Sequence, residues 1–209
     1  MLVFSKAKLV LLSVPKTGTT AYQAALAPLA SLVVTDPPEL KHAPIFRYNR
    51  YFRPMLEKFI GENLDVMAVI REPISWLGSW YRYRRRDFMK GHANATHDIS
   101  FDDFIAAYMR GNKPGFANVG SQAKFLEPAG NGTAATHVFR YEDQAGITAF
   151  LERRLETTLA TTRHNVSPEM PVHLTADVEA KLRLKCADEF TLWNSIRADG
   201  AYTPLPHSG

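Results

Sequence analysis

The feature that most constrains the fold is an apolar run near the start of the sequence that leads directly into a loop of Lys, Thr and Gly. Residues 9–14 (Leu-Val-Leu-Leu-Ser-Val) have the character of a buried strand, and residues 21–26 are compatible with a helix. A turn between a strand and a helix arranges backbone N–H groups and a helix amino terminus around an anion. The segment 8–26 therefore predicts a phosphate-binding turn at the end of a buried strand.

The side chains of this loop add further groups that bind anions. Lys16 supplies a positive charge with three N–H donors, and Thr17, Thr19 and Thr20 place hydroxyl groups around Gly18. The pattern is not a Walker A motif, because the lysine comes first and only one glycine follows it. Taken alone, the loop fits either a phosphate site or a simple turn from strand to helix.

Apolar runs and helical patterns alternate along the rest of the chain. Strands are predicted at residues 9–14, 30–35, 65–70 and 136–140, with helices between and after them. Such alternation predicts an α/β fold of three layers, in which a mainly parallel sheet is flanked by helices. Ligands bind at the carboxyl ends of the strands in sheets of this kind, so the loops that follow them are expected on one rim. A single long helix is predicted over residues 176–197.

Length and composition bound the kind of protein. With 209 residues and 45% hydrophobic content, we expect one domain over residues 1–209, with residues 199–209 as a flexible tail. The net charge of +4 is modest and comes without extended basic tracts, which argues against a nucleic-acid partner. No apolar stretch approaches the roughly 20 residues of a membrane span. The single cysteine, Cys186, forms no internal disulfide, and we expect a cytoplasmic protein.

A second group of candidate anion ligands follows the predicted strand at 65–70. Arg71 comes directly after this strand, and Ser79 lies eight positions later on a predicted helix. An Arg side chain forms paired hydrogen bonds with phosphate, and a nearby hydroxyl group adds another donor. Considered singly, Arg71 fits an ion pair at a strand end and Ser79 fits a solvated helix residue. Beside the first loop, the two would bind a second phosphate group.

These two elements resemble the sulfotransferases that use 3′-phosphoadenosine-5′-phosphosulfate, here abbreviated PAPS. The resemblance rests on Pro-Lys-Thr-Gly-Thr-Thr at 15–20 and on Arg-Glu-Pro followed by Ser at 71–79, with Tyr-Glu-Asp at 141–143 as a weaker likeness. It implies a P-loop nucleotide-hydrolase-like fold, residues 16–20 around the 5′-phosphosulfate, and Arg71 with Ser79 on the 3′-phosphate. It also implies that Lys16 neutralises the leaving group and that no metal ion takes part.

The acceptor hydroxyl or amine needs a base to receive its proton. His42 is the first candidate, because it follows the strand predicted at 30–35 and an imidazole titrates near neutral pH. Leu-Lys-His-Ala-Pro at 40–44 resembles the segment of carbohydrate sulfotransferases that carries a histidine. Other branches of the family have a glutamate there, which makes Glu39 the second candidate. The alternative for His42 is a hydrogen-bonded loop histidine.

The acceptor is less well defined by the sequence. Two clusters of basic side chains are candidates for binding an anionic acceptor: Arg47, Arg50 and Arg53, and Arg82 with Arg84, Arg85 and Arg86. A solvated surface is the more ordinary explanation of each cluster. The polar residues 163–167 are typical of a loop that closes over a nucleotide. We expect a carbohydrate or small hydroxylated metabolite as acceptor, and the sequence does not predict an oligomeric state.

Two other functions stay open at this point. One is an ATP-dependent small-molecule kinase, against which count the missing Walker A pattern and the lack of an obvious magnesium-binding aspartate after a strand. The other is a nucleotide-binding protein that has lost catalysis, in which His42 is only structural. No His, Cys and carboxylate cluster has metal-ligand spacing, so no metal site is expected.

Overall fold

The computed structural model describes residues 1–159 and 170–204 of the chain. Within them, five short strands form one mixed sheet in the order β3-β1-β2-β4-β5. The strands are β1 (Leu2–Phe4), β2 (Leu9–Leu11), β3 (Leu32–Val33), β4 (Asp65–Ile70) and β5 (His137–Arg140). The four strands predicted from the sequence are present, and β2, β3 and β5 are shorter than predicted.

The direction of β1 corrects the prediction of a mainly parallel sheet. β1 runs antiparallel to both β2 and β3, whereas β4 pairs in parallel with β2 and with β5. β1 escapes prediction because Leu2–Phe4 offers only three residues of apolar pattern before the turn at 5–8. The two antiparallel pairings leave β3 with the same direction as β2. The carboxyl ends of β2, β3, β4 and β5 therefore share one edge of the sheet.

Helices cover both faces of this sheet, and others lie beyond it. The helices of the described residues are α1 (Thr19–Leu26), α2 (Pro38–Lys41), α3 (Ile45–Arg47), α4 (Arg53–Ile60), α5 (Pro73–Tyr83), α6 (Phe101–Tyr108), α7 (Gln122–Leu126), α8 (Gln144–Leu155), α9 (Ala176–Lys185) and α10 (Ala187–Ser195). Successive strand residues point to opposite faces, so Val10 packs in the cluster with α4, α7 and α10, while Leu9 and Leu11 pack with α1 and α8. The predicted α/β class with helices on both faces is confirmed.

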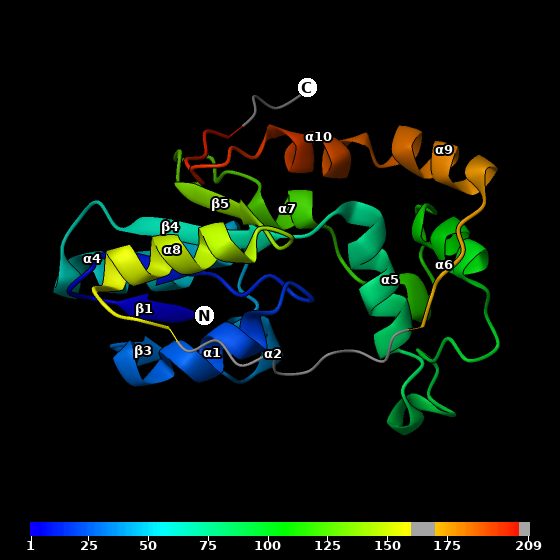
Figure 1. Ribbon diagram of the computed structural model, residues 1–209, viewed down its shortest axis with the longest axis horizontal. Coiled ribbons are helices and arrows are strands. Elements are labelled where there is room, and N and C mark those ends of the chain that lie inside the picture. The colour runs from blue at the N-terminus through cyan, green and yellow to red at the C-terminus, as the bar shows by residue number, and fades with distance from the viewer. Residues whose placement is uncertain (160–169, 205–209) are drawn as a thin grey trace.

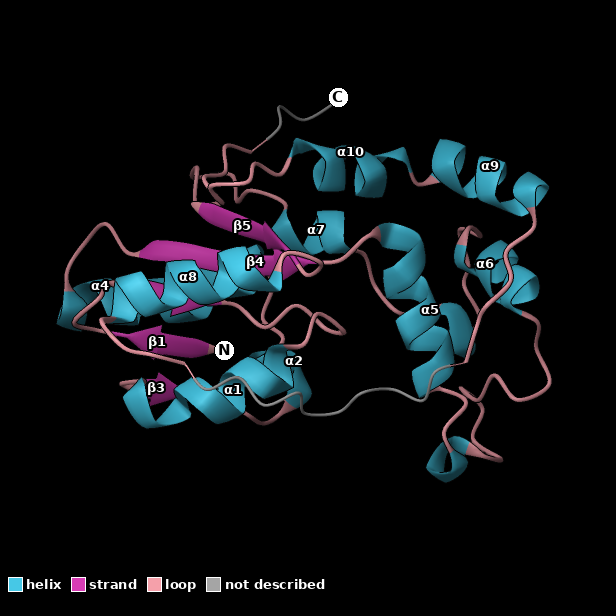
Figure 2. Ribbon diagram, viewed as in Figure 1, coloured by secondary structure: helices cyan, strands magenta, loops and turns pink. Residues whose placement is uncertain are grey.

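A third apolar cluster lies outside the sheet. Trp76 and Tyr81 of α5 pack with Phe104 of α6 and Leu182 of α9, and we call these three helices the helical lobe. Because only two residues lie between the end of β4 and the start of α5, the lobe lies beyond the carboxyl end of β4. Figures 1 and 2 show α5, α6 and α9 gathered at one end of the molecule and the strands at the other.

The carboxyl-terminal part of the chain departs from the prediction at its long helix. The helix predicted over 176–197 is broken at Cys186, whose backbone is not helical. Leu182 of α9 and Phe190 of α10 both pack in the third cluster, and Leu192 of α10 packs in the cluster with α4 and α7. At the start of the segment predicted to be a tail, the carbonyl of Gly200 accepts a hydrogen bond from the N–H of Val138, and the N–H of Tyr202 donates to the carbonyl of Thr136. Residues 205–209 lie outside the described part. No helix among the described residues has the length and apolar character to cross a membrane.

Candidate functional site

The loop after β2 has the backbone conformation of a tight anion-binding turn. Lys16 and Gly18 both have left-handed backbone angles, with φ of 67° and 73°, and the buried Thr17 between them donates its hydroxyl to the carbonyl of Val14 at 2.9 Å. Left-handed geometry is easily adopted by glycine and costs a lysine about 1 kcal/mol. The hydroxyl of Thr17 is thus engaged within the loop and closes the turn.

Five consecutive backbone N–H groups are left open by this turn. Within the described residues, no acceptor receives a hydrogen bond from the N–H groups of residues 16–20. Gly18 caps α1 without a side-chain hydrogen bond, and the first turn of α1 holds no acidic residue. The positive end of the helix dipole is therefore not neutralised by the chain itself. The loop predicted to cradle a phosphate has donors free to do so.

Lys16 is held against two aromatic rings of α5. Its ammonium nitrogen lies 3.1 Å from the centroid of Tyr83 and 4.7 Å from that of Trp80. Burial, together with the smaller effects of the positive charges of Arg86 and Arg84, lowers the pKa of Lys16 to about 7. An anion bound at the loop would offset this repulsion, so the free site favours a negatively charged ligand.

Arg71 is placed at the carboxyl end of β4, as predicted. Its Nε donates to the hydroxyl of Ser75 at 2.9 Å, and its guanidinium carbon lies 4.6 Å from the ring centroid of Tyr141. No acceptor among the described residues occupies its two terminal nitrogens. Ser75 is therefore the hydroxyl that orients Arg71, and the terminal nitrogens are free to form a fork on a phosphate. Ser79 is buried one helical turn further along α5.

The ring of Tyr141 brings the loop and Arg71 together. A side-chain carbon added to Gly18 would lie 2.9 Å from Cε2 of this ring, and the ring also stacks on Arg71. Gly18 is thus required both by its backbone angle and by the closeness of Tyr141. One aromatic ring separates the two predicted anion sites, so a single ligand with two anionic groups can reach both.

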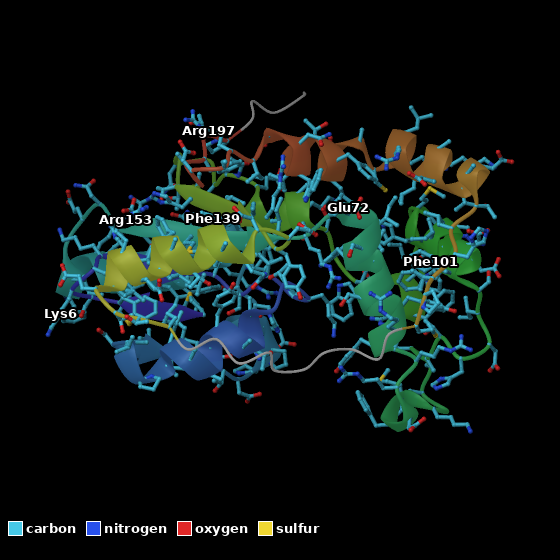
Figure 3. The ribbon with its side chains drawn as sticks, viewed as in Figure 1. Lys6, Glu72, Phe101, Phe139, Arg153 and Arg197 are labelled. Carbon is cyan, nitrogen blue, oxygen red and sulfur yellow. The ribbon has the colours of Figure 1, made fainter. Side chains whose placement is uncertain are left out.

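Several groups that support Arg71 carry no strong signal in the sequence. The backbone N–H of Arg71 donates to Oε1 of Gln122 at 2.8 Å, and Nε2 of Gln122 donates back to the carbonyl of Arg71 at 2.9 Å. The next residue, Glu72, donates its N–H to Glu142 at 2.9 Å and caps α5 by accepting from the N–H of Ser75. Figure 3 shows Glu72 at the start of α5, where the sheet meets the helical lobe.

His42 lies beside the segment that leads from β2 into the loop at residues 15–20. Its Nδ1 lies 2.7 Å from the carbonyl oxygen of Ser13. A carbonyl only accepts, so Nδ1 carries the proton and Nε2 of the neutral ring is the basic nitrogen. Burial lowers the pKa of His42 below its ordinary value, and the charge of Lys16 acts in the same direction. The imidazole is thus neutral at pH 7, as a base requires, whereas Glu39 is exposed.

The basic clusters proposed for the acceptor divide into engaged and open side chains. Arg84 and Arg85 donate to backbone carbonyls of residues 115, 118 and 96, which makes both part of the lobe's framework. Arg53 forms an ion pair with Glu57 at 2.7 Å. Arg50 is exposed and lines an open pocket of about 510 Å³ with Phe46, Asn49 and Lys124 among its walls. Among the arginines of the two clusters, Arg50 is therefore the most accessible to an acceptor.

Two sequence expectations are not resolved by this geometry. Residues 163–167, predicted to close over a nucleotide, lie outside the described residues. Over residues 1–159 and 170–204, no group of three or more His, Cys, Asp or Glu side chains is placed to hold a metal ion.

Comparisons with models of protein families, with curated protein sequences and with solved structures found no match for this chain.

Proposed function

We propose that this protein is a sulfotransferase with a P-loop-like fold that moves a sulfuryl group from PAPS to a hydroxyl or amine of a carbohydrate or small metabolite. The observation that carries the proposal is the contact of one ring, Tyr141, with both Gly18 and Arg71. PAPS carries a 5′-phosphosulfate and a 3′-phosphate, so it needs two adjacent anion sites of this kind. The resemblance of residues 15–20 and 71–79 to the PAPS-dependent family gives independent support.

The transfer follows from the groups at the loop. An acceptor oxygen attacks the sulfur as the bond from sulfur to the bridging phosphate oxygen breaks, and that oxygen takes the electron pair. Lys16 and the open N–H groups of residues 16–20 neutralise the charge that develops there. Nε2 of His42 receives the acceptor's proton and later releases it to water. The products are the sulfated acceptor and adenosine 3′,5′-bisphosphate.

Ligand binding tests the proposal directly. Isothermal titration calorimetry of the full chain should show adenosine 3′,5′-bisphosphate binding at least about 100-fold more tightly than ATP with magnesium, because only the first places a phosphate on Arg71. Transfer of sulfur-35 from labelled PAPS to hydroxylated acceptors then tests turnover. Equal or tighter binding of ATP would favour the kinase instead, and binding without transfer would favour a protein that has lost catalysis.

The base is tested by replacing His42. His42→Asn should lower kcat by about 10²–10⁴-fold, because among the described residues no other imidazole forms a hydrogen bond with the segment between β2 and α1. In the unmodified protein kcat/KM should fall as pH decreases through a value below 6.5, where His42 of the free protein becomes protonated, and this acid limb should disappear in the variant. Glu39→Gln is the matched comparison and should keep the limb. Loss of activity in Glu39→Gln with a normal His42→Asn would transfer the role to Glu39.

A further inference from the structure

The backbone of Arg71 leaves the sheet at the point where its side chain is needed. β4 ends at Ile70, whose carbonyl still accepts from Tyr141, so Arg71 is the first residue that no neighbouring strand pairs. A half-buried backbone N–H or carbonyl without a partner is costly, and a residue at a frayed strand end has an uncertain direction. Some other group must therefore hold Arg71 in place.

Gln122 takes the place of the missing strand. Its amide accepts from the N–H of Arg71 at 2.8 Å and donates to the carbonyl of the same residue at 2.9 Å, which is how one residue of a neighbouring strand would pair. Only one orientation of the amide satisfies both bonds. Gln122 is 1% exposed, so its end of both bonds is buried, while Arg71 is half-buried.

The helix that carries Gln122 is itself firmly placed. Gln122 is the first residue of α7, where the hydroxyl of Ser121 caps the helix by accepting from the N–H of Lys124 at 3.0 Å. Phe125 and Leu126 of the same helix are buried in the apolar cluster beneath the sheet. The amide of Gln122 is thus supported by a capped and packed element, as a group that positions another residue must be.

We infer that Gln122 is a positioning residue, which aims the fork of Arg71 at the 3′-phosphate and so determines how strongly the site selects nucleotides with that group. The inference rests on the proposed function, because it assigns Gln122 a role toward the phosphate bound by Arg71. Ser75 and Tyr141 contact the guanidinium group of Arg71 and hold that end of the side chain. The backbone of Arg71 is held by Gln122.

The experiment compares two nucleotides that differ only in the 3′-phosphate. Affinities for adenosine 3′,5′-bisphosphate and adenosine 5′-monophosphate are measured by calorimetry for the unmodified chain and for Gln122→Met, which keeps the volume without the amide. We expect Gln122→Met to lower the affinity for the bisphosphate about tenfold and the affinity for the monophosphate less than twofold. In an Arg71→Ala background the same change should have no further effect, because the group it aims is gone.

Two further variants separate positioning from stability. Ser121→Ala removes the cap of the same helix without touching Arg71, and it should leave the ratio of the two affinities unchanged. Gln122→Asn keeps the amide one carbon shorter and provides the measurement if Gln122→Met does not fold. Equal weakening of both nucleotides, or a full effect in the Arg71→Ala background, overturns the inference alone. Failure of the unmodified chain to bind the bisphosphate overturns the proposed function, and this inference with it.

Discussion

We expect Lys16→Met to suppress the proposed sulfuryl transfer and at the same time to stabilise the free protein. We expect kcat to fall by about 10²–10³-fold or more, because the charge that neutralises the leaving oxygen is lost. The pKa of Lys16 is about 7 in the folded protein and 10.5 in its ordinary state. Between these pH values the unfolded chain binds more protons, so wild-type stability rises with pH from about 7 to 10.5. Methionine removes the buried charge that penalises folding at lower pH.

The melting temperature measures this effect. The Lys16→Met variant should melt several degrees above the unmodified protein at pH 7, at about 2–4 °C per kcal/mol for a chain of this size. The difference should shrink as pH rises toward 10.5. Lys6→Met, in an exposed turn that Figure 3 shows far from Glu72, is the matched control and should change neither stability nor turnover. A destabilised variant that remains active would contradict both parts of the prediction.

The same lysine sets the alkaline limit of activity. Because kcat/KM reports the free protein, kcat/KM for PAPS should fall as pH increases above about 7, where Lys16 loses its proton. Lys16→Arg keeps a positive charge at all accessible pH values and should remove this limb. An unchanged alkaline limb in Lys16→Arg would assign that titration to another group.

The second large effect belongs to Arg71. Arg71→Ala should weaken adenosine 3′,5′-bisphosphate by about 100-fold or more, because hydrogen bonds to charged groups contribute about 1.5–3 kcal/mol each. Adenosine 5′-monophosphate, which lacks the 3′-phosphate, should bind nearly as before. The affinity of Arg71→Lys for the bisphosphate should fall between those of the unmodified protein and Arg71→Ala, since lysine keeps the charge but loses both the fork and the bond to Ser75.

Calorimetry with both nucleotides gives the comparison for Arg71. Arg153→Ala is the control, because Arg153 is exposed on α8 and lies well away from Glu72 in Figure 3. It should change neither affinity by more than a small screening effect. If Arg71→Ala weakens both nucleotides equally, Arg71 supports the fold of the site and does not read the 3′-phosphate.

Local pattern was sufficient to place the main candidate anion ligands at the ends of two strands. An apolar strand that runs into Lys16 and Gly18, and a second that stops at Arg71, each carry their signal within a few consecutive residues. Right-handed crossovers between parallel strands then place both loops on one edge. His42 follows the same logic, since β3 shares the direction of β2.

The groups that support these ligands were not predictable in the same way. Gln122 is 51 residues from Arg71 in the sequence, and nothing in its neighbourhood distinguishes it from any other helix-initiating glutamine. The seat of Lys16 on Tyr83 and Trp80 depends on where the helical lobe rests, which no periodicity encodes. β1 was missed for a related reason, because three apolar residues gain meaning only from the strands beside them.

Helix α5 has a consequence for how the molecule responds as a whole. It supplies the rings beneath Lys16, it orients Arg71 through Ser75, and Nε1 of Trp76 donates to the carbonyl of Pro15 at 2.9 Å. The same helix is a wall of the lobe's apolar interior. A ligand that binds both loops would therefore also stabilise the helical lobe against unfolding, because α5 contacts the loops and belongs to the lobe. A bound nucleotide would link the sheet to the helical lobe. Slower amide hydrogen exchange in the interior of the lobe would then report nucleotide binding at residues that the nucleotide does not contact.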